Sequence, residues 1–599
     1  MPAATKTKAG GGVPNVRSLR REMRAIWSQL EPDYQQWYSR YRELAESLEP
    51  MKSQFYQEDH QGTKESTFNE IMDNTATLAG RTAASGLHSS MTSPASPWYK
   101  LGVKGQEELS WESRKWIDDL TADMRQVHAQ SNLYKLMPQF YESDVHFATA
   151  AMLAEPHPER VIHFTELPLG SYRIANDPDG RVNVFAREFQ MTVRQVVEEF
   201  AVVDAQGNID WMNISPQVRR QWDLQQWENK VNITHVITPN PRYSPGALDA
   251  KFKRYLSCYY EAKGGAGYGS VGGYGGSIAD DVVLKETGYD LFPVLVMRWK
   301  VRGPQDAYGS SCPGIMSLGD VKGLQQLEKV SLQAIEKQAN PPLVGPEPTN
   351  GIISTLPGHH TIESMTEGRQ GLRPLYQVAP DIVALEGKAE QTRGRINRAY
   401  YVSTFQALTN LAGGQKTVPE VQELKAEKLV ELGGVLEQFN FDFGDPLIDL
   451  SYAYMLMFNR VRPAPEELSG ATLEVEYISI LAQAMKLSGI EGIERWWGFS
   501  ASVATGKGST EPLDVVDTDA LLRHYGDMAS VPADVVLPAD KVAEIRAARA
   551  QQQQTLAAAQ AIQAGAGVVK DLAASPTNGP NALTALLGRS RAGSLVPAA

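Results

Sequence analysis

The sequence predicts an α+β fold that is mainly helical, and three observations support this. Residues 317–339 contain no proline and form a helix of about 35 Å at ~1.5 Å per residue, which Asn340-Pro341-Pro342 ends. Residues 160–189 alternate polar and apolar side chains around the turn sequence Asp177-Pro178-Asp179-Gly180. Residues 419–439 carry leucines at helical spacing. At 599 residues the chain exceeds one compact core, so several parts are expected.

The first third of the chain is expected to be helical, over residues 16–50, 66–91 and 109–152. In the second of these helices, five residues fall near one face at helical spacing: Ile71, Thr75, Leu78, Thr82 and Leu87. Small residues between them allow close helix packing: Ala76, Ala79, Ala83, Ala84 and Gly86. Residues 1–15 are rich in glycine, alanine and lysine and predict a disordered tail without a secretion signal.

A β-rich part follows from Pro158. It contains a short helix over 191–200 and strands over 232–239, 253–263 and 281–286. The Gly/Tyr-rich segment 264–276 includes a formal GxGxxG at Gly267, Gly269 and Gly272. No helix opens at this segment, so a long hairpin loop is favoured over a dinucleotide site.

The helix over 317–339 is apolar on more than one side, which indicates a helix that is buried or flanked on two sides, as in a ring. One stripe comprises Leu318, Val321, Leu324, Leu332 and Ile335, and Leu327 and Val330 lie off it. Residues 341–378 are expected to be irregular, with short strands, because five prolines lie in this segment before residue 360. A second helix is expected over 381–401.

The remaining segments are expected to be a Gly-rich loop over 403–417, helices over 419–439 and 446–461, and a strand over 473–480. Residues 511–540 carry seven acidic side chains and one basic side chain. Their net charge of -6 is half of the chain's net charge of -12. Residues 541–564 have high helix propensity, and 565–599 are expected to be poorly ordered.

The bulk composition argues against tight binding of nucleic acid through phosphates, because the net charge is -12 and such proteins usually carry a basic patch. The net charge does not argue against DNA passing through the protein, because a channel that lets DNA slide should avoid strong phosphate contacts. Cys258 and Cys312 form no CxxC pair, and Cys258 is expected to be a small buried hydrophobe. Two cysteines fit assembly in a reducing cytoplasm, and no apolar run is long enough for a membrane span.

Motifs for catalysis are missing from the sequence. The strings at 413–417 and 506–510 lack the Walker order, and neither HExxH nor an EF-hand loop occurs. His359-His360 is the only adjacent histidine pair, and it is interpreted either as a plain exposed loop or as part of the bore of a ring. The chain is therefore expected to be no enzyme, with no metal and no cofactor.

Several motifs occur in an order that resembles bacteriophage head-to-tail connecting proteins, the portals of short-tailed phages. The quoted segments are DNTATLAGRTAASGL at 73–87 with Pro97-Trp98-Tyr99, GSYRIA at 170–175, AREFQM at 186–191, HVITPN at 235–240, residues 288–343, and TVPEVQELKAEK at 417–428. Together they cover residues 20–460. The Gly/Tyr-rich loop and the C-terminus depart from the pattern.

This resemblance implies a portal fold assembled as a ring of twelve at one capsid vertex, through which the genome is packaged, retained and ejected. It implies a wing (16–316), a stem helix (317–339), a clip of α/β type (340–379), a second stem helix (380–402), a channel loop (403–417), a long helix returning to the wing (418–516) and a helical crown (517–599). The implied partners are terminase, the tail adaptor, and the major capsid and scaffolding proteins, in the host cytoplasm and then in the virion.

The resemblance also assigns candidate sites. Residues facing DNA would be Lys416, Gln415, Asn410, Arg393, Arg395 and Arg398. Clip docking residues would be His359, His360, Arg369 and Arg373. The three arginines at 393–398 have a second interpretation, as ion-pair partners of Glu386 and Glu390 on the same helix.

The charges fit a low-friction channel. Twelve chains with a net charge of -12 each would carry -144 in total. Residues 317–400 hold nine acidic and nine basic side chains, so the expected stem and clip are nearly neutral, and a wall without net positive charge would not hold DNA. The alternative is another structural ring protein of the virion, such as a tail adaptor or tube component. A nuclease or a packaging ATPase would need a motif that the sequence lacks.

Overall fold

A computed structural model describes residues 16–50, 71–95, 97–104, 109–203, 208–262, 283–341, 343–344, 373–375, 381–409, 433–470, 472–477, 493–503, 505–506, 517–528 and 541–557. The chain divides into two compact units, which are described separately. Unit 1 comprises residues 1–106 and 119–491, and unit 2 comprises 107–118 and 492–599. The mixed helix and strand composition confirms the α+β class.

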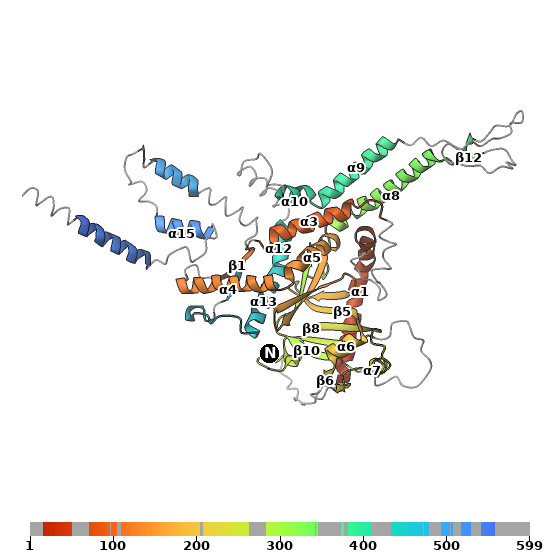
Figure 1. Ribbon diagram of the computed structural model, residues 1–599, viewed down its shortest axis with the longest axis horizontal. Helices are drawn as coiled ribbons and strands as arrows, with labels where there is room; N and C mark the ends of the chain where they lie inside the picture. The colour runs from red at the N-terminus through yellow and green to blue at the C-terminus, as the bar shows by residue number, and fades with distance from the viewer. Residues whose placement is uncertain are drawn as a thin grey trace, which may run out of the picture. The chain divides into compact units, whose positions relative to one another are not determined.

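The largest sheet of unit 1 is antiparallel, with the order β10-β9-β8-β5-β4 (Figure 1). Its strands are β4 (Tyr172–Asn176), β5 (Val182–Thr192), β8 (Lys230–Pro239), β9 (Tyr255–Glu261) and β10 (Lys285–Tyr289). The predicted turn joins β4 to β5, and Gly180 adopts a φ of 85° that favours glycine. The strands predicted over 232–239 and 253–263 are confirmed as β8 and β9. The strand expected over 281–286 runs over Lys285–Tyr289 instead.

Helices cover both faces of this sheet. α1 (Val16–Leu48) packs Leu19, Met23 and Leu30 against one face, where Cys258 lies fully buried as predicted. Burial raises the pKa of this thiol to about 12. Since side chains alternate along a strand, the neighbouring Tyr259 points to the other face, which α6 (Val193–Phe200) and α7 (Pro216–Asp223) cover.

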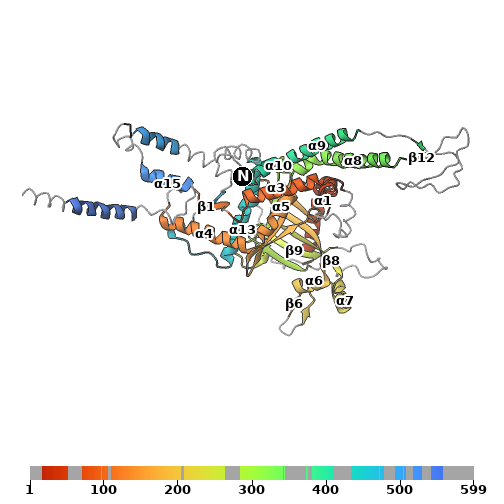
Figure 2. The same cartoon turned by 45° about the horizontal axis from the view of Figure 1, so that its top comes forward.

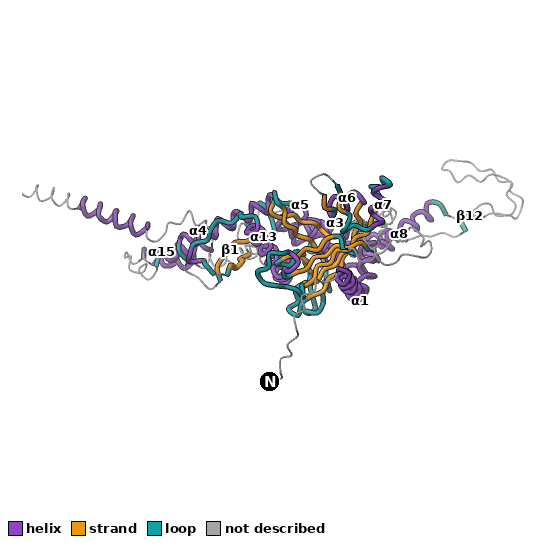
Figure 3. The backbone as a smooth tube through the Cα atoms, turned by 90° about the horizontal axis from the view of Figure 1, so that it is seen from below, coloured by secondary structure: helices purple, strands orange, loops and turns teal. Residues whose placement is uncertain are grey.

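A second sheet has the order β11-β2-β3, and β11 (Val294–Arg298) is buried throughout. Most strands of unit 1 gather beside α1, as the orange tubes in Figure 3 show. The helix expected over 109–152 is instead α4 (Trp111–Gln130) and α5 (Leu133–Phe147), followed by β2 (Thr149–His157). Ala148, with a φ of 62°, ends α5 in the left-handed region, and β2 then pairs with β11 and β3 (Val161–Leu167). Buried pairing to two strands overrides the local helix propensity of this segment.

Shorter strands pair elsewhere in unit 1. β1 (Tyr99–Val103) pairs with β14 (Leu473–Tyr477), and β6 (Val202–Val203) pairs with β7 (Ile209–Asp210). The strand expected over 473–480 is therefore confirmed as far as Tyr477, and its end lies outside the described residues. The short 3-10 helices are η2 (Ala250–Phe252) and η6 (Glu466–Leu468).

α3 (Thr75–Met91) starts later than predicted, because residues 71–74 are not helical. Leu78, on the face that the helical spacing marks, is 59% exposed. The buried face is made of the small residues instead, because neighbouring side chains approach the backbone. A Cβ on Gly80 would lie 2.2 Å from His146 Cε1, and one on Gly86 would lie 2.2 Å from Phe405 Cδ1.

α8 (Pro313–Ala339) and α9 (Ile382–Ala399) lie side by side and extend from the body of unit 1 (Figures 1 and 2). α8 begins four residues before the predicted start, because Cys312 caps it and Pro313 fits the first turn. Beyond the free ends of the two helices, β12 (Leu343–Val344) pairs antiparallel with β13 (Arg373–Pro374). These are short strands in the segment where such strands were expected.

The chain after α9 differs from the expected loop. α10 (Val402–Thr409) is helical, so residues 403–409 correct that prediction, and residues 410–417 lie outside the described residues. α12 (Gly433–Phe439) runs through the π-helix η5 (Asn440–Gly444) into α13 (Asp445–Met457), which ends before the predicted Val461. In unit 2, helices span α15 (Thr518–Met528) and residues 493–503 and 541–557. Among the described residues, no helix is long and apolar enough to cross a membrane.

The start of α8 packs directly on the end of α5. A Cβ on Gly314 would lie 2.3 Å from the carbonyl oxygen of His146, so Gly314→Ala is expected to lower the free energy of unfolding by about 1–3 kcal/mol. Gly319→Ala, on the same helix with open space around it, is expected to raise it by about 0.5–1 kcal/mol. Urea unfolding of both variants checks this, and equal effects would contradict the close packing.

Candidate channel and docking region

The base of the α8–α9 pair is held by one arginine. Arg393 on α9 contacts Asp73 Oδ2 through Nε at 2.9 Å and Glu328 Oε1 on α8 through Nη2 at 2.7 Å. A longer contact of 3.4 Å reaches Glu390, one turn earlier on α9. Arg393 therefore joins α8, α9 and the segment before α3 through charge-assisted hydrogen bonds.

The same segment is bound by Gln325 of α8. Its Oε1 accepts hydrogen bonds from the backbone N–H groups of Met72 and Asp73 at 2.7 and 3.0 Å, and its Nε2 donates to the carbonyl oxygen of Asp73 at 2.7 Å. Lys322, one turn before Gln325, pairs with Glu43 of α1. The α8–α9 pair is thus fixed at its base to α1 and to the segment before α3.

The acidity of Asp73 reflects this network. Burial raises the pKa of Asp73, but hydrogen bonds from Thr75 and Arg393 outweigh burial and leave the pKa below its usual value. The hydrogen bond to Asp73 in turn raises the pKa of Arg393. The carboxylate form of Asp73 is therefore the one that the fold stabilises, and protonation would weaken the contact at acidic pH.

The other two arginines are more exposed. Arg395 Nη2 contacts Asp320 Oδ1 of α8 at 2.8 Å, with half of its side chain exposed. Arg398 is exposed, and within the described ranges no ion pair involves it. The structure thus brings Arg393 and Arg395 into contacts within one chain and leaves Arg398 facing solvent.

The outer half of the pair exposes apolar side chains. Within α8, Leu332 is 55% exposed and Ile335 is 40% exposed, and Val383 of α9 is 79% exposed. Of the predicted apolar stripe of α8, Val321 and Leu324 are buried near the base. Several exposed apolar side chains on one pair of helices indicate a surface that another protein covers.

The remaining candidate residues are not placed. Asn410, Gln415, Lys416, His359, His360 and Arg369 lie outside the described residues. Arg373 belongs to β13, of which the backbone alone is described. Their roles stay predictions.

Sequence reasoning missed Asp73 and Gln325 as parts of this region. Asp73 opens the motif at 73–87, but a carboxylate before a helix is commonly only a cap. Gln325 lies among apolar residues on α8 and carries no charge. The contacts span more than 250 residues of sequence, so helical periodicity gives no signal for them.

Arg393→Gln is expected to lower the free energy of unfolding by about 1–2 kcal/mol, since its hydrogen bonds to carboxylates are partly exposed to solvent. Amide hydrogen exchange in α8 around Gln325 is expected to speed up. Arg398→Gln on the same helix is the control and should change neither quantity measurably. Equal protection of α8 in both variants would contradict a holding role for Arg393.

Comparison with known proteins identifies the family. The family model described as bacteriophage head to tail connecting protein matches residues 20–537. The portal protein of Salmonella phage epsilon15 is 36% identical over 566 residues, covering 93% of this chain and 96% of that protein. The probable portal protein of Bordetella phage BPP-1 is 34% identical over 568 residues, covering 94% and 97%.

Among solved structures, a chain in the virion of a native gene transfer agent particle aligns with 72% of this chain and 86% of its own length. Its identity is 10% and its TM-score is 0.31, which is too low to support a conclusion about the fold. The family match and the two relatives are independent of this structural likeness. The chain belongs to the bacteriophage head-to-tail connecting protein family, and its function is that of a portal, a structural protein and not an enzyme.

Proposed function

We propose that twelve copies of this chain form a ring at the head-tail vertex of the virion, with α8 and α9 of each copy lining a channel for double-stranded DNA. The genome enters the capsid, is retained and leaves through this channel. Residues 340–379 form the clip, which docks terminase during packaging in the host cytoplasm and the tail adaptor afterwards. The wing contacts the capsid and scaffolding proteins, and residues 517–599 form the crown.

The observation that carries this proposal is the α8–α9 pair, which ion pairs and hydrogen bonds hold at its base and which exposes apolar side chains in its outer half. Val330 and Leu332 on α8 and Val383 on α9 are exposed within one chain. Copies arranged around an axis would cover these side chains with the helices of their neighbours. A single chain in water would leave them exposed, which hydrophobic burial disfavours.

The mass of the purified protein tests this assembly. A ring of twelve chains of 65.9 kDa has a mass of about 790 kDa, which native mass spectrometry resolves from rings of eleven or thirteen. Leu332→Glu is expected to shift the protein towards smaller species, whereas Leu248→Glu, at a fully exposed position outside the pair, should not. A wild-type protein that stays a monomer in the presence of scaffolding protein would overturn the proposal.

Lys416 belongs to the segment proposed as the channel loop. A single lysine beside paired glycines would touch DNA phosphates weakly, so Lys416→Glu is expected to reduce genome retention or packaging by repelling DNA. Counting DNA-filled particles after expression of the variant measures this. Normal filling and retention by Lys416→Glu particles would exclude a DNA contact at this residue.

A further inference from the structure

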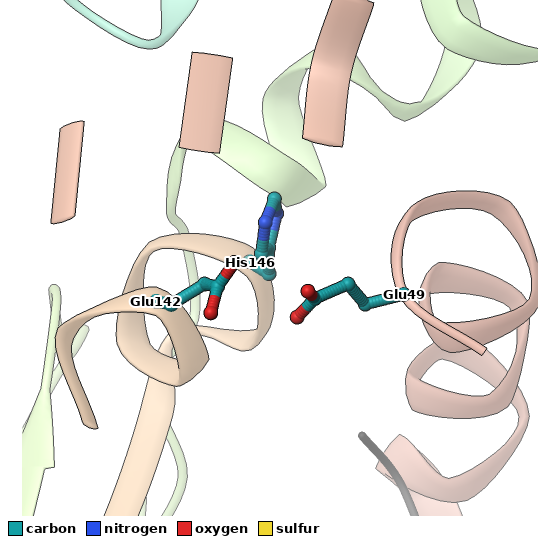
Figure 4. Close-up of side chains that lie close together, drawn as sticks. All are labelled: Glu49, Glu142 and His146. Carbon is teal, nitrogen blue, oxygen red and sulfur yellow. The ribbon is translucent and has the colours of Figure 1, made fainter. Parts of the chain in front are cut away.

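Three ligand-type side chains of unit 1 meet outside the α8–α9 pair. Glu142 and His146 lie one turn apart on α5, and Glu49 reaches them from the residue after α1 (Figure 4). One ligand atom from each lies within 4.8 Å of the other two. Residues four apart on a helix share a face, so α5 presents its two ligands together.

We propose that Glu49, Glu142 and His146 bind a divalent transition-metal ion such as Zn²⁺ or Mn²⁺. One imidazole nitrogen with two carboxylates is a donor set that suits these ions. A tetrahedral ion with bonds of about 2.1 Å separates its ligand atoms by about 3.4 Å. Closing the observed spacing by up to about 1.4 Å therefore completes three bonds, and rotation of the two long glutamate side chains supplies this movement.

The histidine is held in place for this role. Its Nδ1 shares a hydrogen bond of 3.1 Å with the hydroxyl of Tyr400, which makes Nε2 the ligand nitrogen. A second contact that fixes the opposite ring nitrogen is typical of metal-binding histidines. The ring is fully buried and packs against the backbone of Gly80, so its orientation is fixed before any ion binds.

The two carboxylates of this cluster favour a divalent ion over the guanidinium of Arg81, which pairs with them in the structure. The side chains of Glu49 and Glu142 are only 12% and 14% exposed, and buried carboxylates need positive charge nearby. Arg81 approaches them at 3.6 and 3.3 Å, but its side chain is 61% exposed. A guanidinium brings one positive charge to two carboxylates, whereas a divalent ion brings two at much shorter distance. Arg81 can rotate into solvent when the ion enters.

The proposed ion would join α1 to α5, next to the start of α8. It does not depend on the ring or the DNA channel, because all three ligands come from one chain. Its effect is structural: the ion fixes the end of α1 onto the helix against which Gly314 packs. Metal binding is expected to stabilise the chain in proportion to the logarithm of ion concentration.

Isothermal titration calorimetry of the full-length protein after EDTA treatment tests the proposal, with Zn²⁺ and Mn²⁺ as separate probes. The wild type is expected to bind one ion per chain and to gain thermal stability. Glu142→Gln and Glu49→Gln should weaken binding at least tenfold, whereas Glu46→Gln, an exposed glutamate of α1 that pairs with Arg42, should leave it unchanged. Arg81→Gln should strengthen binding, since it removes the competing cation.

Two results would overturn the proposal. One is a wild-type protein that binds neither ion, in which case Arg81 and the two glutamates form an ion pair network and no metal site. The other is binding that survives both Glu142→Gln and Glu49→Gln, which would place the ion elsewhere. His146→Gln is not needed for the decision, because substitution of this buried ring could unfold the chain.

Discussion

Arg298→Met is expected to lower the free energy of unfolding by about 3–5 kcal/mol, the largest loss predicted for this chain. Arg298 ends β11 and is 1% exposed. Its Nε and Nη2 donate to the two carboxylate oxygens of Asp442 at 2.8 and 2.6 Å, and Nη2 also donates to the carbonyl oxygen of Gly180 at 2.8 Å. Removal of the arginine leaves Asp442 in the π-helix buried without this partner.

A second substitution separates the charge from the packing. Arg298→Met combined with Asp442→Leu removes both charges, and such apolar replacements of a buried pair are often neutral. The double variant is therefore expected to recover most of the stability that Arg298→Met loses. Arg302→Gln, which breaks an exposed pair with Asp306, should cost less than about 1 kcal/mol. Urea unfolding measures all three, and a double variant as unstable as Arg298→Met would show that shape, not charge, dominates.

Asp144→Asn is expected to stabilise the protein increasingly as pH rises from 5 to 8. Asp144 on α5 is fully buried, and neither of its carboxylate oxygens accepts a hydrogen bond of normal geometry from the described residues. Burial raises the pKa of Asp144 well above its usual value, and the nearby Asp442 raises it further, although the backbone N–H of Trp299 opposes them. The fold therefore favours the protonated carboxyl.

The sign of the pH effect follows from this direction. The stability due to protonated Asp144 is fully present below the unfolded-state pKa of about 3.9 and is lost as pH rises through the folded-state pKa. In that window the wild type loses about 1.4 kcal/mol per pH unit relative to Asp144→Asn. Urea unfolding at pH 5 and 8 should show a gap that widens at pH 8 by at least about 1 kcal/mol. Asp223→Asn, at an exposed site on α7, should show no such gap.

Short sequence patterns predicted the turns and helices that depend on neighbouring residues alone. The turn at 177–180 and the long helices α1, α8 and α9 follow from turn residues and helical periodicity. Predictions failed where tertiary pairing decides. Residues 149–152 continue a helical pattern yet form β2, because strands on both sides bury them. On α3, the buried face is the one whose side chains are small enough for Phe405 and His146 to approach.

The candidate site was only partly accessible to the same reasoning. The cationic cluster on α9 could be found from Arg393, Arg395 and Arg398, and so could its possible pairing with Glu390. The partners that hold Arg393 most closely, Asp73 and Glu328, come from other elements. The same holds for Glu49, which lies 97 positions before His146 and meets it only in the fold. No periodicity within one segment encodes contacts of this range.

Electron cryomicroscopy of the assembled protein tests the proposed channel most directly. A reconstruction without imposed symmetry is expected to show twelve copies around a central hole wide enough for duplex DNA, with α8 and α9 of every copy facing that hole. The apolar side chains Leu332, Ile335 and Val383 should then lie between neighbouring copies. A ring in which the α8–α9 pair points away from the axis, or an assembly without a central passage, would contradict the proposed channel.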